Sequence, residues 1–458
     1  TTINNSVAVG YGAMGAVPAG QAVEYAVAIG TNALLGNGST TTGINGTTAV
    51  GFGAGYSLTT GGNNTFLGYN AGYTATTGGE NTIVGRHAGN KIEKGSSNAF
   101  LGYSAGHYTT GSYNTFVGKD AGKGGTTSAP YSSGEGNTAV GYGALDAFTT
   151  ADNNTILGYR AGYSTTTGNN NVYLGYQAGY RGTTALENIA IGPNSQQGVS
   201  GQTTGRYNVS LGVNSLFGLT TGNHNFVVGS NAGYSLTGGE HNVIIGSAAG
   251  DALTTTSNAI MIGREAGTNI NSGDANGTVL VGTYAGRELT NGQYNTMIGN
   301  QAGQLVTTAD GNTFVGHQAG KNWTTAGTNT ALGFEALYRY DTNTHGDIYA
   351  SNTAVGYNAG NSVTTGVENT LVGALAGDAM TDADRNTVVG YLALTTNTKS
   401  DRNTAIGRSA LENLNHTSVT SGLNTAIGHG AGSLLTTGEK NTIVGSYSGN
   451  QDSLFFRG

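Results

Sequence analysis

The chain repeats one short phrase along its length. The phrase is Asn-Thr, an apolar residue, then Val, Ile or Leu, then Gly, two variable residues and Ala, as in "NTILGYRAGYSTTTGNNNVYLGYQAGY" at 154–180. If each copy is marked by its glycine, here called the anchor glycine, there are 25 copies between Gly10 and Gly445. Most steps between copies are 17 residues, and seven are longer, at 19 to 23 residues. Self-similarity at a fixed spacing is typical of repeat architectures.

A repeat of 17 residues is too short for a pair of helices or a propeller blade, but it suits one coil of a β-solenoid. The residue before the anchor glycine is Val, Ile or Leu in all 25 copies, and the residue three after it is Ala in 22. Such constancy is expected if equivalent positions lie above one another at about 4.8 Å, because a change of size disturbs both neighbours. The sequence therefore predicts an all-β fold, a parallel β-solenoid of the β-roll or β-helix type with about 25 coils.

The chain is predicted to form a single continuous solenoid over residues 1–458. We expect irregular coils in 1–51, regular coils in 52–445 and a cap or connector in 446–458, with insertions near 119–136, 193–207, 264–277, 334–351 and 408–423. After Gly118 the long steps fall once in every four copies. Insertions four coils apart would emerge about 19 Å apart along one side.

Three positions of the repeat are expected to form structural ladders. Asn stands four residues before the anchor glycine in 20 copies, and stacked amides can hydrogen-bond from coil to coil. We expect the Val, Ile or Leu before the glycine to face the coil interior. The ladders are represented by Asn64, Asn81 and Asn154, by Val84, Leu101 and Val117, and by Ala71, Ala88 and Ala105.

The residue two before the anchor glycine is apolar in 24 of 25 copies. On a strand it points away from its neighbour, so both faces of the strand are expected to be buried, one of them against other chains in a homotrimer. Where this residue is small, a large one often stands four after the glycine, as with Ala139 and Leu145, which predicts that the two positions touch. The recurrent Thr-Thr-Gly, for example at 76–78, predicts a turn with positive φ at its glycine.

Composition excludes several classes of protein. Only 9% of the residues are charged, 81 are Gly and three are Pro, which excludes collagen because it needs abundant proline. The net charge of −7 provides no basic face for nucleic acid. There is no cysteine, and no stretch approaches the roughly 18 apolar residues of a membrane span.

Two pairs of segments carry a resemblance to known families. "NSVAVGYGAMGA" at 5–16 and "YAVAIGTNALLG" at 25–36 resemble the head repeats of trimeric autotransporter adhesins, which form left-handed β-rolls packed as trimers. "NTAVGYGAL" at 137–145 and "NTAVGYNAG" at 352–360 are similar to repeats of phage and bacterial tail-fibre-like proteins. The 17-residue coil is longer than the adhesins' unit. Such proteins often end in a membrane-anchoring barrel or a self-cleaving chaperone, and "SGNQDSLFFRG" at 448–458 resembles neither.

The sequence predicts no catalytic, cofactor or metal site. "GYGAMG" at 10–15 fits the dinucleotide pattern GxGxxG, but no helical segment follows it. The eight histidines lack paired ligand spacing, and carboxylates such as Glu80, Glu240, Glu368 and Glu439 recur at turns just before the Asn position. We therefore expect a protein that is not an enzyme and uses no cofactor.

Two features are candidates for surface binding. Tyr follows the anchor glycine in eight copies, and these rings either stack on sugar rings or pack between coils. The insertions carry aromatic and charged residues, and loops on a rigid scaffold often make recognition sites; the alternative is that they widen a trimer or join neighbours laterally. The candidates are Tyr69, Tyr103, Tyr159 and Tyr176 in the repeats, and Tyr131, Tyr338, Tyr340 and His345 in the insertions.

These patterns favour a structural protein: an extracellular fibre or adhesin rod, the shaft or head of a surface or virion appendage. It would assemble with itself as a homotrimer, bind a host-surface glycan or protein through its loops, and use neither nucleic acid nor membrane insertion. Twenty-five coils would span on the order of 120 Å. One alternative is a self-assembling filament subunit that stacks head to tail through open strand edges. Another is an ice-binding solenoid built on paired threonines.

Overall fold

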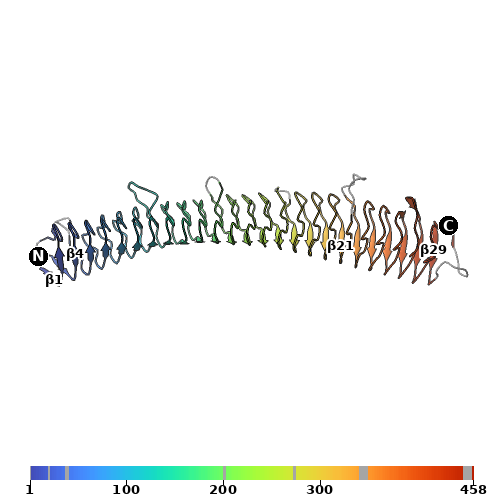
Figure 1. Ribbon diagram of the computed structural model, residues 1–458, viewed down its shortest axis with the longest axis horizontal. Helices are drawn as coiled ribbons and strands as arrows, with labels where there is room; N and C mark the ends of the chain where they lie inside the picture. The colour runs from blue at the N-terminus through green and yellow to red at the C-terminus, as the bar shows by residue number, and fades with distance from the viewer. Residues whose placement is uncertain are drawn as a thin grey trace. The chain divides into compact units, whose positions relative to one another are not determined.

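The chain folds as a parallel β-solenoid of about 25 coils, which confirms the predicted fold class. The computed structural model describes residues 2–18, 21–36, 41–199, 203–271, 275–339 and 349–446 and the strand at 456–457. It divides into two compact units, Thr1–Val227 and Val228–Gly458. In both units most coils contribute one short strand and a few add a second, and the described residues include no helix (Figure 1).

Almost every strand is three residues long and ends immediately before an anchor glycine. The strands of the first unit are β1 (Thr2–Asn4), β2 (Val7–Val9), β3 (Ala22–Glu24), β4 (Val27–Ile29), β5 (Thr48–Val50), β6 (Thr65–Leu67), β7 (Thr82–Val84), β8 (Ala99–Leu101), β9 (Thr115–Val117), β10 (Thr138–Val140), β11 (Thr155–Leu157), β12 (Val172–Leu174), β13 (Ile189–Ile191) and β14 (Val209–Leu211), and the division between the units falls within β15 (Phe226–Val228).

The strands of the second unit are β16 (Val243–Ile245), β17 (Ile260–Ile262), β18 (Val279–Val281), β19 (Thr296–Ile298), β20 (Thr313–Val315), β21 (Thr330–Leu332), β22 (Thr353–Val355), β23 (Thr370–Val372), β24 (Thr387–Val389), β25 (Ser400–Asp401), β26 (Thr404–Ile406), β27 (Thr420–Ser421), β28 (Thr425–Ile427), β29 (Asn441–Val444) and β30 (Phe456–Arg457).

Equivalent residues pair directly from coil to coil. Val84 on β7 lies opposite Leu101 on β8, and Leu101 lies opposite Val117 on β9. The long steps do not disturb this register, because β9 and β10 pair in the same way across a 23-residue step. The loop within 119–136 leaves its coil away from the strand and projects beyond the neighbouring turns (Figure 1).

Backbone hydrogen bonds between coils continue outside the strands. The N–H of Gly72 donates to the carbonyl of Ala88 at 3.0 Å, and the N–H of Thr76 donates to Glu93 at 2.7 Å. The anchor glycine is required where the strand turns: Gly68 has φ +139°, and a Cβ there would lie 2.5 Å from the carbonyl oxygen of Gly85 in the next coil. The coils are therefore laddered along several edges, which explains why the repeat tolerates so little variation at the anchor.

The face of the strand that points into the coil is the opposite of the one predicted. The residue two before the anchor glycine forms the inner column, represented by Phe66, Ile83 and Phe100, all essentially inaccessible to solvent. The Val, Ile or Leu before the glycine points outward, and Leu101 is 52% exposed. Alternation along the strand was predicted correctly, but the identity of the inner side was not, because both positions are apolar.

Two further columns complete the interior. Ala71, Ala88 and Ala105 are fully buried, three residues after their anchor glycines. The residue seven after the anchor glycine is also buried in many coils, as with Leu58 and Trp323, whose Nε1 donates to the Leu337 carbonyl at 2.5 Å. Sequence reasoning missed this second large column, although its recurrent Leu, Ile and Val were visible.

The predicted contact between the second residue before and the fourth after the anchor glycine is confirmed. A Cβ on Gly106 would lie 2.5 Å from the Phe100 ring, so the two positions share one space. The predicted positive φ at the glycine of Thr-Thr-Gly is wrong, because Gly78 and Gly168 are not among the residues with positive φ. A side chain is excluded there for another reason: the Cβ of Gly78 would collide with the carbonyl oxygen of Gly95.

The C-terminal end of the second unit carries an antiparallel strand. β30 pairs with β29, with Thr442 opposite Phe456 and Asn441 opposite Arg457. Thus one backbone edge of β29 is paired with a strand of the same chain. Of the segment 446–458, residue 446 and this short strand lie within the described residues.

Candidate functional site

In each unit the asparagines four before the anchor glycines form a buried ladder, which is interrupted in the second unit at Ala259 and Thr278. The backbone N–H and Nδ2 of Asn81 both donate to Oδ1 of Asn64 at 3.0 Å, and Nδ2 also donates to the Gly95 carbonyl at 2.9 Å. Asn154 makes the same contacts with Asn137 and Gly168. Because each amide has partners in adjacent coils, the ladder holds the coils together. These side chains are buried and hydrogen-bonded, so they are not available to bind a ligand at the surface.

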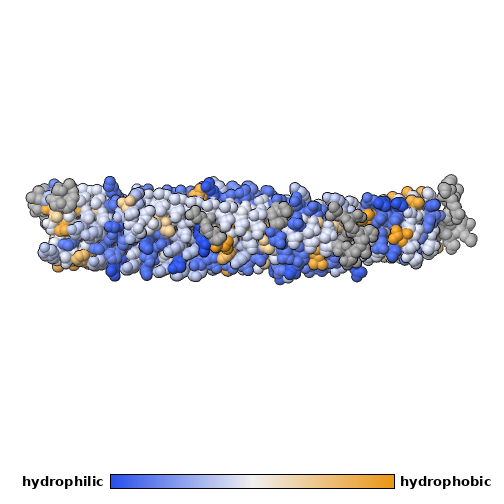
Figure 2. Space-filling view, turned by 90° about the horizontal axis from the view of Figure 1, so that it is seen from above, coloured by the Kyte–Doolittle hydropathy of each residue, from blue (hydrophilic) through white to orange (hydrophobic). Residues whose placement is uncertain are grey.

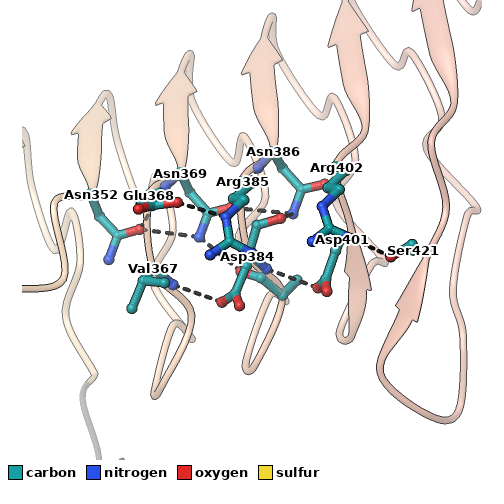
Figure 3. Close-up of polar contacts among 11 residues, drawn as sticks. Asn352, Val367, Glu368, Asn369, Asp384, Arg385, Asn386, Asp401, Arg402 and Ser421 are labelled. Atoms are coloured by element: carbon teal, nitrogen blue, oxygen red, sulfur yellow. Dashed lines mark hydrogen bonds and ion pairs between the residues drawn. The ribbon is translucent and has the colours of Figure 1, made fainter. Parts of the chain in front are cut away.

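A second ladder lies two residues earlier in the repeat. In the second unit the N–H of Val367 donates to Oδ1 of Asp384, and the N–H of Asp384 donates to Oδ1 of Asp401, both at 3.0 Å (Figure 3). In the first unit Asp152 accepts from the N–H of Glu135 at 2.8 Å. Sequence reasoning missed this ladder; its signal is the recurrent Asp, Asn or Ser six residues before the anchor glycine.

The carboxylates next to the Asn ladder serve the turns. Glu368 pairs with Arg385 of the next coil, with Oε2 and Nε 2.7 Å apart, and Arg402 donates to Oγ of Ser421 at 2.5 Å (Figure 3). Glu80 accepts a hydrogen bond from Oγ of Ser97 at 3.2 Å. These contacts run along the turn edge and do not bring two carboxylates together around a common point.

The residues immediately before the anchor glycines form the outer aliphatic column. Leu67, Leu101 and Leu157 are each about half exposed, at 46%, 52% and 49%, and Val84 and Val117 are partly buried. The neighbouring outward position, three before the glycine, is Thr in most coils but Val or Ile in β12 to β14 and in β16 to β18. By contrast, the surface seen in Figure 2 carries hydrophobic residues in small scattered groups among hydrophilic and neutral ones. The outer aliphatic column is thus a regular apolar strip on the sheet surface of each unit.

The residues immediately after the anchor glycines form an unbroken ring column in the first unit. Each member contacts the next, through ring stacking or through a cation over a ring face, with centroid distances of 5.1 to 5.8 Å. Its eight members are Phe52, Tyr69, Arg86, Tyr103, Lys119, Tyr142, Tyr159 and Tyr176.

The stacking decides which parts of the rings are accessible. Tyr142 and Tyr159 are inclined by 11° and Tyr159 and Tyr176 by 6°, so each ring covers a face of its neighbour. Arg86 lies between Tyr69 and Tyr103, and Lys119 lies between Tyr103 and Tyr142. The ring edges remain exposed while the faces are largely covered, so stacking of a sugar on a free tyrosine face is not available along most of the column. Arg86 and Lys119 were not among the residues predicted from the sequence.

The candidates in the insertions are dispersed. The Tyr131 ring stacks on Tyr108 with centroids 6.2 Å apart, and the Lys91 ammonium lies 5.9 Å from its centre. In the second unit Lys321 lies 5.8 Å from the centre of the Tyr338 ring. Tyr340 and His345 lie outside the described residues. Tyr131 is therefore the insertion residue with the most extensive described contacts.

The first unit holds a cluster of cations beside the ring column. Burial lowers the pKa of His107 to about 4, helped by the nearby His87, Lys91 and Lys123. Burial and the Arg86 guanidinium also lower the pKa of His87. Both imidazoles are held neutral near pH 7, and their shifts indicate a locally positive environment.

A shallow groove follows the turn edge of the first unit. One part has a volume of about 530 Å³ and the next about 390 Å³, and both are bordered by Tyr113, whose side chain is 67% exposed. The first part is lined by Tyr113, Ser133, Glu135, Gly136, Thr150, Asp152 and Asn153. Its lining is acidic and polar, in contrast to the cationic ring column.

Other chemical sites find no support in the described part of the chain. Residues 10–15, which match the dinucleotide pattern, form the turn after β2. No three His, Asp or Glu side chains in the described ranges are grouped so as to hold a metal, and no described helix is available to cross a membrane. Comparison with known proteins gives no match: no family model fits the chain, and no curated protein is significantly similar.

Proposed function

We propose that the protein is a structural, self-associating scaffold: an extracellular fibre or adhesin rod, acting as shaft or head of a surface or virion appendage. The single observation that carries the proposal is the outer aliphatic column. One Val, Ile or Leu per coil faces outward in both units, and a monomer would leave this strip in water. Burying such a strip against copies of the same chain favours a homotrimer.

The polar architecture supports a scaffold rather than an enzyme. The buried asparagines are engaged in the ladder, and the acidic side chains of the second ladder accept backbone hydrogen bonds. These groups stiffen the coils and are not free to act on a substrate. The loop within 119–136 projects from this frame and offers a surface for attachment to a host glycan or protein.

Head-to-tail stacking into a filament is the alternative function. Open parallel edges promote it, but β30 pairs along β29 and competes with another chain for that edge. This pairing favours discrete particles over an endless polymer. The ice-binding alternative rests on the paired threonines of the repeats, such as Thr166 and Thr167, and the long steps interrupt that array. Absence of thermal hysteresis would dismiss it.

Measurement of the native mass of the purified chain, together with electron micrographs of the particles, tests the proposal. We expect a discrete trimer, which Leu67→Asp combined with Leu101→Asp dissociates by placing charge on the outer aliphatic column. Thr60→Asp with Thr77→Asp, on the exposed turn edge of the same unit, is the matched control and should leave the trimer intact. A polydisperse polymer would favour the filament, and a monomer at all concentrations would contradict self-association.

A further inference from the structure

The cations of the ring column are held in place by aromatic rings. The Arg86 guanidinium lies 5.6 Å and 5.8 Å from the ring centres of Tyr69 and Tyr103, and the Lys119 ammonium lies 5.7 Å and 5.5 Å from those of Tyr103 and Tyr142. No ion pair between either cation and a carboxylate is found in the described part of the chain. Rings fix the position of a cation without neutralising its charge, so both remain able to bind an anion.

The two cations repeat along a rigid frame. Arg86 and Lys119 are two coils apart on paired strands, which corresponds to roughly 10 Å. Arg160, two coils further on, lies over Tyr159 and Tyr163 at 5.4 Å from each ring centre. Such spacing presents positive charge at regular intervals, with tyrosine edges and hydroxyls between the charges.

We propose that the ring column of the first unit binds a linear acidic polysaccharide, whose carboxylates meet Arg86 and Lys119 and whose hydroxyls meet the exposed tyrosine edges. A guanidinium can hold a carboxylate through two parallel hydrogen bonds. A repeating polymer matches a repeating column, since successive sugar acids meet successive coils. This proposal adds a class of ligand to the proposed scaffold. It rests on the proposed function only for the extracellular setting.

The same geometry disfavours nucleic acid. Single-stranded nucleic acid is bound by stacking bases on free aromatic faces, and here neighbouring rings and cations cover those faces. The chain as a whole is acidic, with a net charge of −7, and the groove on the turn edge carries Glu135 and Asp152. The ring column and the cations beside it thus differ in charge from the groove on the turn edge.

The test is calorimetric titration of the full chain with polygalacturonate fragments at low salt. Fully methyl-esterified fragments provide the uncharged match, and single-stranded DNA provides a different polyanion. We expect saturable binding of polygalacturonate that weakens as salt is added, with weaker binding of the ester and of DNA. Arg86→Gln with Lys119→Gln should weaken it by about tenfold or more, because hydrogen bonds to charged groups are among the stronger ones.

Arg408→Gln is the matched control, since Arg408 occupies the same repeat position in the second unit, 5.8 Å from the Tyr391 ring centre. It should leave polygalacturonate affinity unchanged. Arg86→Lys with Lys119→Arg retains both charges, should also retain binding, and guards against loss of structure in the first variant. Failure of the wild-type chain to bind, equal affinity of the Gln variant, or equal affinity for the ester or DNA would overturn the proposal. None of these results would alter the native mass, which tests the scaffold separately.

Discussion

The interiors of the two units are built from the same buried columns, but their surfaces differ. In the first unit Arg86 and Lys119 lie over tyrosine rings in an unbroken column. In the second unit the same repeat position includes Ser230 and Ser247. Arg264 at this position lies over the Tyr284 ring but also pairs with Glu265. At another position Arg385 pairs with Glu368. Positions that face the interior are fixed by close packing, whereas outward positions are free to acquire different chemistry. The difference supports the proposal that the ring column of the first unit contacts an anionic partner.

The largest effect is expected from truncating the inner column, and it should be equal in the two units. Phe100→Ala in the first unit and Phe314→Ala in the second each remove a fully buried ring and should cost about 3–5 kcal/mol of unfolding free energy. Hydrogen exchange of the affected and adjacent coils measures the loss. Leu101→Ala and Val315→Ala are the outward controls and should cost far less in the unassembled chain. A larger loss from Leu101→Ala than from Phe100→Ala would restore the orientation first expected from the sequence.

The Asn ladder should come next. Asn154→Ala and Asn369→Ala each remove side-chain hydrogen bonds to both neighbouring coils, and every buried group left unsatisfied should cost about 1–3 kcal/mol. Local hydrogen exchange should rise on both sides of the substitution to the same extent in either unit. Thr155→Ala, on the exposed side of β11, is the control. Unequal losses would mean that the two interiors are not equivalent.

Acid should weaken the first unit through His107. Its folded pKa of about 4 lies below the unfolded value of 6.5, so the unfolded chain takes up a proton that the folded coil excludes. Stability is therefore fully present above pH 6.5 and falls as the pH is lowered from 6.5 toward 4. Hydrogen exchange around His107 at pH 7 and pH 5 should show this, and His107→Gln should remove that part of the pH dependence. An unchanged pH response in the variant would contradict the assigned cause.

The smallest effects are expected from the surface cations themselves. Arg86→Gln loses an exposed cation–ring contact and Arg385→Gln loses an exposed ion pair, and each should change the unfolding free energy by about 1 kcal/mol or less. Urea denaturation of the single variants compares the two. Salt should diminish the contribution of Arg385 because exposed ion pairs are screened. A large loss in either variant would assign that cation a structural role and weaken the contrast between the units.

The stacking of the coils was predicted well because the residues that determine it recur at a fixed spacing in the sequence. The constant residues around each anchor glycine and the recurrent Asn were sufficient to predict parallel coils, the amide ladder and the contact between positions such as Phe100 and Gly106. The sequence did not reveal which side of the strand is inner. Phe100 and Leu101 are both apolar, and alternation alone cannot distinguish inside from outside when neither position is polar.

The candidate site was only partly predictable. Tyr69 and Tyr103 were visible as tyrosines after a glycine, but Arg86 between them looked like an exception to that pattern. Only the coil-to-coil register shows that the arginine continues the column. Contacts between coils depend on which residues stack on one another. At variable positions of the repeat, the sequence pattern does not show which residues these are.

Cryo-electron microscopy of the purified full chain at side-chain resolution would show the stacking and the orientation of the strands directly. We expect, in both units, strands about 4.8 Å apart with Phe66 and Phe314 inside the coil and Leu67 and Val315 on its outer surface. Coils out of register, or Leu67 and Val315 buried inside with Phe66 and Phe314 outward, would contradict this expectation.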